Sequence, residues 1–185
     1  MMPAFPGHSA PAAGFEVPLE MLAACHLRVQ AQCETLQRLL PHVAAQGSDR
    51  PAREAATAVM RYFDSSARHH HEDEEVDLFP ALARAALQAP EPHALIASLC
   101  ADHRELETRW QTLRAVLARL AQGQAVTLEA AEVQGFVERY QRHIEREEAE
   151  LLPLAARLLG DAELDRVGLA MRARRGLAPP GPGAG

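Results

Sequence analysis

Two His-x-x-x-Glu pairs, 73 residues apart, have the residue types and spacing of a chemical site: His70 with Glu74, and His143 with Glu147. A spacing of four residues places both members of a pair on one face of an α-helix. Each pair also lies on the apolar stripe of its segment, so the side chains are expected to point into a core. Because buried carboxylates and imidazoles are costly without a partner, two such pairs facing each other favour bound metal ions.

The two pairs belong to an internal repeat. The segments that begin at His70 and His143 are identical at six of eleven positions, and both end in a proline. A weaker match aligns the surroundings of His26 with those of His103. The chain therefore looks like two copies of a helical hairpin, each with one single histidine and one His-x-x-x-Glu pair.

Counting residues from the predicted turns places these side chains at one level. His26 lies 22 residues before the turn near residue 48 and His70 lies 22 after it, while His103 and His143 lie 21 before and 19 after the turn near residue 124. The turn near residue 90 fits less well, with 20 residues to His70 and 13 to His103. Antiparallel neighbours would still bring these levels together inside a bundle. The predicted metal ligands are His26, His70, Glu74, His103, His143 and Glu147.

Four long amphipathic segments position these residues. Ala, Leu, Glu, Arg and Gln are strong helix formers, so the composition favours an all-α fold. Asp49 and Thr127 are the expected N-caps of the second and fourth segments, and Pro80 is expected to kink the second. Short connections make neighbours antiparallel, which predicts an up-down-up-down four-helix bundle. The expected divisions are a flexible tail over 1–16, the bundle over 17–160, a short C-terminal helix over 161–176 and a flexible tail over 177–185.

Composition argues against several classes of protein. A formal charge of −6 disfavours a nucleic-acid binder, and no apolar run is long enough for a membrane span. The basic run 172–175 is interpreted as a solvated helix end. The three cysteines, Cys25, Cys33 and Cys100, form an odd and scattered set, which is typical of reduced thiols in the cytoplasm. We therefore expect a cytoplasmic protein that binds neither nucleic acid nor membrane.

Other polar residues near the predicted centre are given weaker roles. His69 and His71 flank His70 and are expected to point to other faces, as solvated or supporting residues. His42 lies 16 residues beyond His26, or roughly 24 Å along a helix, and is too far away. Tyr140 lies one turn before His143, where a hydrogen bond to a metal-bound oxygen species and simple packing are both compatible with its position.

Together these motifs resemble the hemerythrin-like family with the HHE cation-binding domain. The resemblance covers about residues 18–160 and implies a four-helix bundle that holds two Fe ions. In that family the two irons are joined by an oxo or hydroxo bridge and by the two glutamates. The motifs that carry the resemblance are His26, His70-x-x-x-Glu74-Glu75 with Leu78-Phe79-Pro80, His103, and His143-x-x-x-Glu147-Glu148 with Leu151-Leu152-Pro153.

The chain departs from the oxygen-carrying hemerythrins at two positions. Those proteins have a second histidine four residues after the third-helix histidine, where this chain has Glu107. They also use an aspartate five residues after the fourth-helix histidine, whereas Glu147 follows at four. The resemblance then implies four histidine ligands rather than five. If Glu107 binds iron, a third carboxylate favours irreversible oxygen chemistry; if Leu106 takes the inward direction instead, one iron keeps an open position.

Three functions are compatible with this resemblance. The first is binding of a small diatomic ligand, oxygen or nitric oxide, with any signalling or electron donation passing through a separate protein partner. The second is a di-iron redox enzyme: an oxidase, a peroxidase, a nitric-oxide reductase or an iron–sulfur repair protein, although repair proteins usually carry an N-terminal domain with paired cysteines that this chain lacks. The third is iron handling. Manganese or zinc could occupy similar oxygen and nitrogen ligands.

Overall fold

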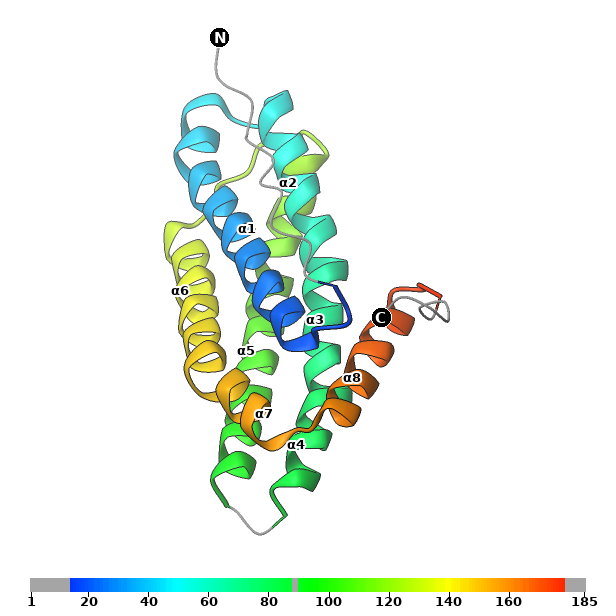
Figure 1. Cartoon of the computed structure of the whole chain (residues 1–185). Helices are drawn as coiled ribbons and strands as arrows, with labels where there is room; N and C mark the ends of the chain where they lie inside the picture. The colour runs from blue at the N-terminus through cyan, green and yellow to red at the C-terminus, as the bar shows by residue number, and fades with distance from the viewer. Residues whose placement is uncertain (1–13, 88–89, 179–185) are drawn as a thin grey trace.

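The structure, a computed structural model, describes residues 14–87 and 90–178. Every element in these residues is helical, and four long helical rods run alternately up and down (Figure 1). The predicted all-α, up-down-up-down bundle is therefore confirmed. None of the described helices combines the length and apolar character that a membrane crossing requires. Most of the expected flexible tails, 1–16 and 177–185, lies outside the described residues.

The first rod is a single helix, α1 (Pro18–Gln46). Pro18 occupies the first turn, where a missing backbone N–H leaves no helical hydrogen bond unmade. The helix continues through Pro41 and stops at Gly47, whose φ of 65° is a left-handed conformation that glycine adopts without strain.

The second rod alternates between α-helical and wider π-helical turns. Asp49 caps its start, as predicted, by accepting a hydrogen bond from the backbone N–H of Ala52. Pro80 follows the second π-helical segment. A proline removes one helical hydrogen bond and its ring clashes with the carbonyl four residues earlier, and a wider π-helical turn relieves the clash. The elements are α2 (Arg50–Tyr62), η1 (Phe63–Ala67), α3 (Arg68–Glu72), η2 (Asp73–Leu78) and α4 (Phe79–Ala85).

The fourth rod repeats this pattern. The third rod is α5 (Pro90–Ala121). The fourth rod consists of α6 (Ala130–Arg146), η3 (Glu147–Leu151) and α7 (Leu152–Leu158), and Pro153 is the second residue of α7. The expected N-cap at Thr127 is wrong, because Glu129 occupies the N-cap position. Leu128 packs against the core, so the chain crosses the end of the bundle before the helix begins.

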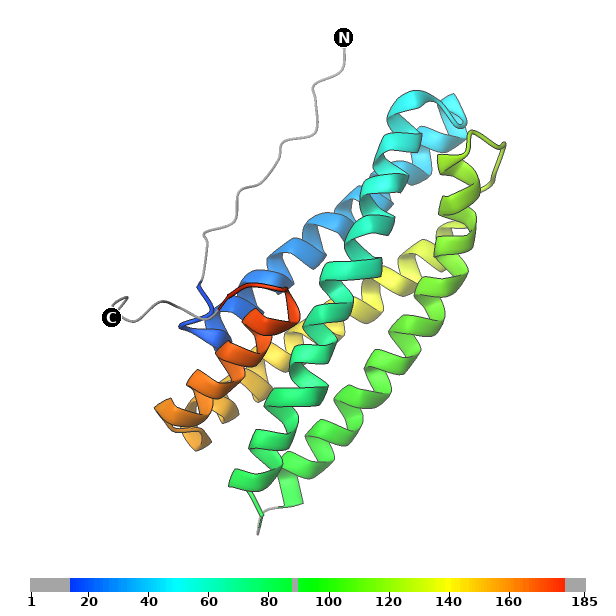
Figure 2. The same ribbon diagram turned by 90° about the vertical axis from the view of Figure 1, so that its right-hand side faces the viewer.

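A fifth helix, α8 (Asp161–Arg174), contacts the start of α1 and the π-helical segment η2 (Figure 2). At Gly168, a Cβ atom would overlap the backbone carbonyl oxygen of Phe15, so glycine permits this close approach. Arg174 and Arg175 form ion pairs with Asp73, which is completely buried. The interpretation of the basic run as a solvated helix end is therefore wrong for these two arginines.

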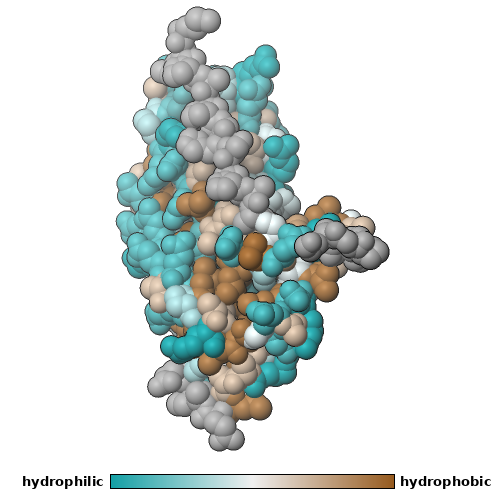
Figure 3. All heavy atoms as spheres, in the orientation of Figure 1, coloured by the Kyte–Doolittle hydropathy of each residue, from teal (hydrophilic) through white to brown (hydrophobic). Residues whose placement is uncertain are grey.

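The apolar core is divided into two clusters, with polar residues between them. One cluster includes Leu36, Phe63 and Phe136, and the other includes Leu78 and Leu151. The second cluster continues onto α8, and apolar side chains reach the surface near the junction of α8 with the bundle (Figure 3). The candidate site lies between the clusters, so apolar packing surrounds it along the bundle axis.

Candidate metal centre

The six predicted ligands converge in one buried cluster from all four rods. Their exposed fractions are all 4% or less. Their ligand atoms form two groups, each with atoms within 4.8 Å of one another, and Glu74 and Glu147 belong to both groups. One group adds His26 and His70, and the other adds His103 and His143. Two adjacent positions that share two carboxylates can hold two metal ions with glutamates between them.

The buried glutamates come from the π-helical segments. Glu74 lies in η2 and Glu147 begins η3. π-helical turns are rare and concentrate at functional sites, where the additional residue in the turn changes the direction of the side chains. In η2 and η3 a proline two residues beyond the segment, Pro80 or Pro153, accounts for the wider turn, whereas η1 has no such proline. The Glu-Glu-x-x-Leu-x-Pro repeat therefore contains both a predicted ligand and the proline beside the helical distortion.

The carboxylates are close to imidazoles without being satisfied by them. The Nε2 atom of His143 is 2.9 Å from Glu147 Oε1, and the Nε2 atom of His26 is 3.1 Å from Glu147 Oε2. Nevertheless, all four carboxylate oxygens of Glu74 and Glu147 lack a partner with hydrogen-bond geometry. A buried polar group left unsatisfied costs about 1–3 kcal/mol, and more if it is charged. A cation among these atoms would satisfy all four oxygens, so the residues fit a metal centre.

The protonation of the metal-free cluster reflects this crowding. Burial and the nearby charge of Glu147 raise the pKa of Glu74 to about 7. Burial alone would lower the pKa of His103, but the Glu147 and Glu74 carboxylates raise it to about 11. Burial, together with the neighbouring imidazole of His26, lowers the pKa of His70 well below its usual value. The cluster thus retains protons in the absence of metal, and cation binding would displace them.

A second glutamate in each copy of the repeat orients a histidine of the other copy. Glu75 Oε1 lies 2.7 Å from the Nδ1 atom of His103, and Glu148 Oε1 lies 3.1 Å from the Nδ1 atom of His26. Such a contact fixes the orientation of the ring, so Nε2 faces the cluster and would offer its lone pair to a metal ion once any proton there is displaced. Sequence reasoning missed these roles, although the duplicated Glu-Glu pair was their visible signal.

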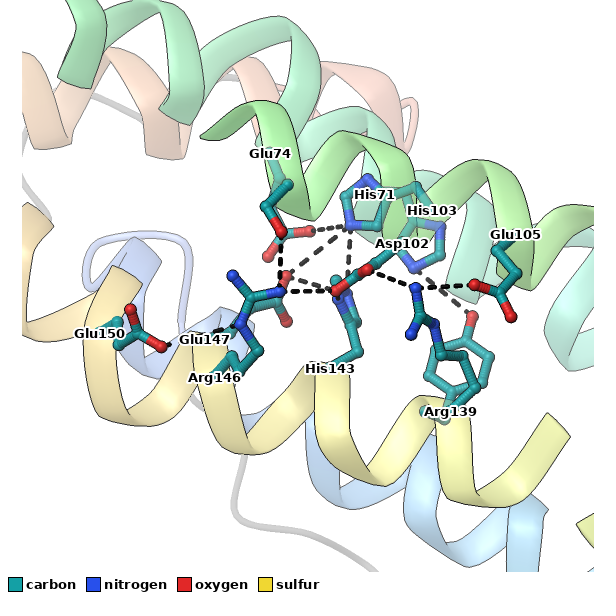
Figure 4. Close-up of polar contacts among 12 residues, drawn as sticks. His71, Glu74, Asp102, His103, Glu105, Arg139, His143, Arg146, Glu147 and Glu150 are labelled. Carbon is teal, nitrogen blue, oxygen red and sulfur yellow. Dashed lines mark hydrogen bonds and ion pairs between the residues drawn. The ribbon is translucent and has the colours of Figure 1, made fainter. Parts of the chain in front are cut away.

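Asp102 lies behind the cluster and is almost completely buried. Its Oδ2 atom is 3.7 Å from the Nδ1 atom of His143, and it pairs with Arg139 at 2.6 Å and with Arg146 at 3.0 Å (Figure 4). In the repeat, the position of Asp102 corresponds to Cys25. The two halves of the site therefore have different surroundings.

Three side chains whose roles the sequence left open now have defined positions. Glu107 is exposed and accepts a hydrogen bond from the side chain of Gln111 at 2.6 Å, so it supplies no third carboxylate. His42 lies away from the cluster, 2.9 Å from Asp49. Tyr140 is buried, and its hydroxyl is 3.4 Å from the Nε2 atom of His71.

His71 lies beside the cluster, contrary to the expectation that it points to another face. One of its ring nitrogens is within 4.8 Å of ring nitrogens of His103 and His143. Its ring stacks on that of His103, with centroids 3.9 Å apart and planes at 12° (Figure 4). Consecutive residues of a helix are about 100° apart, so His70 and His71 can lie on either side of the inward direction. No spacing rule in the sequence distinguished His71 from His69.

A helical bundle with an inward-facing histidine from every rod and inward-facing glutamates from two rods defines a class of cation-binding proteins. The Hemerythrin HHE cation binding domain model matches residues 17–155. The chain is also 32% identical over 158 residues to a protein of Haemophilus influenzae named as uncharacterized, and the match covers 85% of this chain and 90% of that protein. This chain belongs to the hemerythrin family with the HHE cation-binding domain.

Proposed function

We propose that this protein is a non-haem di-iron protein that binds a small diatomic ligand, oxygen or nitric oxide. The observation that carries the proposal is the pair of ligand groups that share Glu74 and Glu147, whose four buried oxygens have no hydrogen-bond partner. Family membership supports a cation at this place.

Each side chain would have a defined task. His26 and His70 would hold one iron, His103 and His143 the other, and the two glutamates would bridge them together with an oxo or hydroxo group. Ferrous iron held there would supply the electrons and the coordination position that a diatomic molecule requires. Glu75 and Glu148 keep their histidines in the ligating tautomer through the Nδ1 contacts.

The composition of the ligand set favours binding over irreversible oxidation. A third carboxylate would have stabilised ferric iron, but Glu107 is exposed and bonded to Gln111. The imidazole-rich set that results is also compatible with iron in preference to the hard, oxygen-binding cations. Apolar clusters on both sides of the centre exclude bulk water, which protects a bound ligand from protons.

A cleft lies near the cluster. Its volume is about 150 Å³, it lies between α1 and α6, and its lining includes Val29, Cys33, Val137 and Tyr140. Tyr140 is the side chain that connects this cleft with the surroundings of the cluster, because its hydroxyl contacts His71.

The experiment is anaerobic loading with Fe(II), followed by measurement of iron per chain and of optical spectra as oxygen is added and removed. We expect about two irons per chain and an absorption band that disappears when oxygen is removed. The double variant His70→Ala/His143→Ala should lose the iron, whereas His42→Ala, distant from the cluster, should retain it. Unchanged iron content in the double variant would refute the metal assignment, and rapid oxidation without a reversible band would favour a redox enzyme.

A further inference from the structure

We infer that Asp73, held by Arg174 and Arg175 at the end of α8, positions the neighbouring predicted ligand Glu74. The C-terminal helix is then part of the metal centre, because metal binding and the docking of α8 each favour the other. This inference rests on the proposed function, since binding of metal is one of the two events that it links.

Asp73 and Glu74 are consecutive residues of η2, and neither has exposed surface. Consecutive helical residues point about 100° apart, so Glu74 faces the ligand cluster while Asp73 faces α8. Arg175 donates to both oxygens of Asp73, at 2.6 and 3.2 Å, in the fork geometry that makes such pairs strong. Arg174 pairs with the same carboxylate and also with Asp77 at 2.6 Å. The segment that carries a predicted ligand is therefore attached to α8.

The second copy of the repeat shows that the ligand motif does not require a buried acid before its glutamate. The residue that corresponds to Asp73 is Arg146, whose side chain is 34% exposed and pairs with Asp102 at 3.0 Å. Glu147, which follows it, nevertheless reaches the cluster. A buried carboxylate is costly unless it is paired. The burial of Asp73 is therefore explained by its partners on α8 and not by the ligand motif.

Metal binding and α8 docking require the same conformation of η2. Without metal, the oxygens of Glu74 lack a hydrogen-bond partner, so the segment gains stability by moving this side chain toward one. Such a movement also shifts Asp73 and weakens the arginine fork. Conversely, without the arginines, Asp73 reaches other partners only if η2 moves, which displaces Glu74 from the other ligands. By linkage, each event stabilises the other to the same extent.

Contacts on the far side of Arg175 offer a way to loosen α8 without altering η2. The guanidinium carbon of Arg175 lies 5.5 Å from the ring centroid of Phe15, where a cation and an aromatic ring attract each other. Gly168 packs against the backbone of Phe15, and a Cβ atom there would overlap the carbonyl oxygen. Gly168→Ala is therefore expected to weaken docking while every charge at η2 is kept.

The first test is titration of the metal-free protein with Co(II) alone, with visible absorption reporting affinity and coordination. Arg174→Ala/Arg175→Ala should weaken cobalt binding by roughly 5–150-fold, the usual range of coupling between two sites, and change the cobalt spectrum. Charge alone predicts the opposite, because removing two cations favours a bound cation. Gly168→Ala should also weaken binding, and it remains decisive if the double variant does not fold.

A matched control separates positioning from lost stability. Leu120→Ala removes a completely buried side chain roughly 25 Å along α5 from His103, so it destabilises the bundle without reaching the centre. This variant should keep the wild-type cobalt affinity and spectrum. An equal loss of affinity in Leu120→Ala would overturn the inference, because lost stability would then explain the weaker binding.

The reciprocal test is amide hydrogen exchange of α8 with and without saturating Co(II). In the wild type, cobalt should slow the exchange of α8 amides that open by local undocking, by up to the same factor as the change in affinity. The variant His70→Ala/His143→Ala, in which the cluster is removed, should show no such change.

The outcomes separate this inference from the proposed function. If the wild-type chain binds fewer than two cobalt ions, the di-metal proposal itself fails. If it binds two, the positioning role alone is overturned when both α8 variants bind as the wild type does, or when α8 exchange does not respond to cobalt, because linkage requires both effects. Tighter binding in Arg174→Ala/Arg175→Ala would also overturn it, since that is the result of charge alone.

Discussion

Replacing Arg174 and Arg175 together by alanine is expected to destabilise the metal-free protein by about 3–5 kcal/mol, the usual cost of breaking a buried ion pair from one side. Asp73 has no exposed surface, and its carboxylate is paired with both arginines, with Arg175 at 2.6 Å. Without the arginines, a charged carboxylate would stay buried in η2, beside the predicted ligand Glu74. The same variant should also loosen α8 from the bundle.

Removing Asp73 should destabilise the protein less than removing the two arginines. In Asp73→Ala, Arg174 keeps its contact with Asp77 at 2.6 Å, and the side chains of Arg174 and Arg175 are 16% and 18% exposed. These cations can therefore find other partners or water, so the single variant should lose less stability than the double arginine variant. The triple variant, which removes the stranded carboxylate too, should be more stable than the double arginine variant.

The measurement is urea unfolding, followed by the fluorescence of the single tryptophan, Trp110, which is buried in the core. A slope of roughly 2 kcal/mol per molar urea, typical for a domain of this size, converts the expected loss into a midpoint shift of about 2 M. Arg166→Ala, in an exposed pair on the same helix, is the control and should change stability by less than about 1 kcal/mol. A loss of that small size in the double arginine variant would refute the reasoning.

Three further predictions concern the docking of α8, the supporting carboxylates and pH. Gly168→Ala should cost about 1–3 kcal/mol in the same unfolding assay, because the new Cβ overlaps a backbone carbonyl; a neutral result would contradict the close packing of α8. Glu75→Gln and Glu148→Gln should each weaken metal binding by about 10–100-fold in a chelator competition, and unchanged affinity would mean that the Nδ1 contacts do not matter. The metal-free protein should lose stability between pH 7 and 10. The pKa of His103 is raised to about 11, so the native state keeps a proton that the unfolded chain releases over this range. Burial raises the pKa of Cys33 to about 12, which also lowers the free energy of unfolding as pH rises. Urea midpoints at both pH values measure this, and a midpoint that rises with pH would contradict the sign.

The sequence alone predicted the four-helix bundle and the antiparallel order of its helices because both depend on local patterns. Apolar residues at helical spacing and short connections define antiparallel helices, and the i, i+4 spacing of His70 and Glu74 fixes their common face without knowledge of the other helices. The second pair, His143 and Glu147, repeats this spacing and supported the same inward direction independently. The six predicted ligands accordingly lie in one cluster.

The remaining features required the tertiary structure, because they depend on how each helix is rotated and on contacts between distant segments. Whether Glu107 or His71 faces the cluster is decided by helix rotation and by the π-helical turns, which a regular 3.6-residue period cannot describe. The crossed contact from Glu75 to His103 joins two helices, and the pairing of Arg175 with Asp73 joins residues 102 positions apart. The sequence thus determined which residue types face inward at each level, whereas only the packing of the helices decided which side chains meet there.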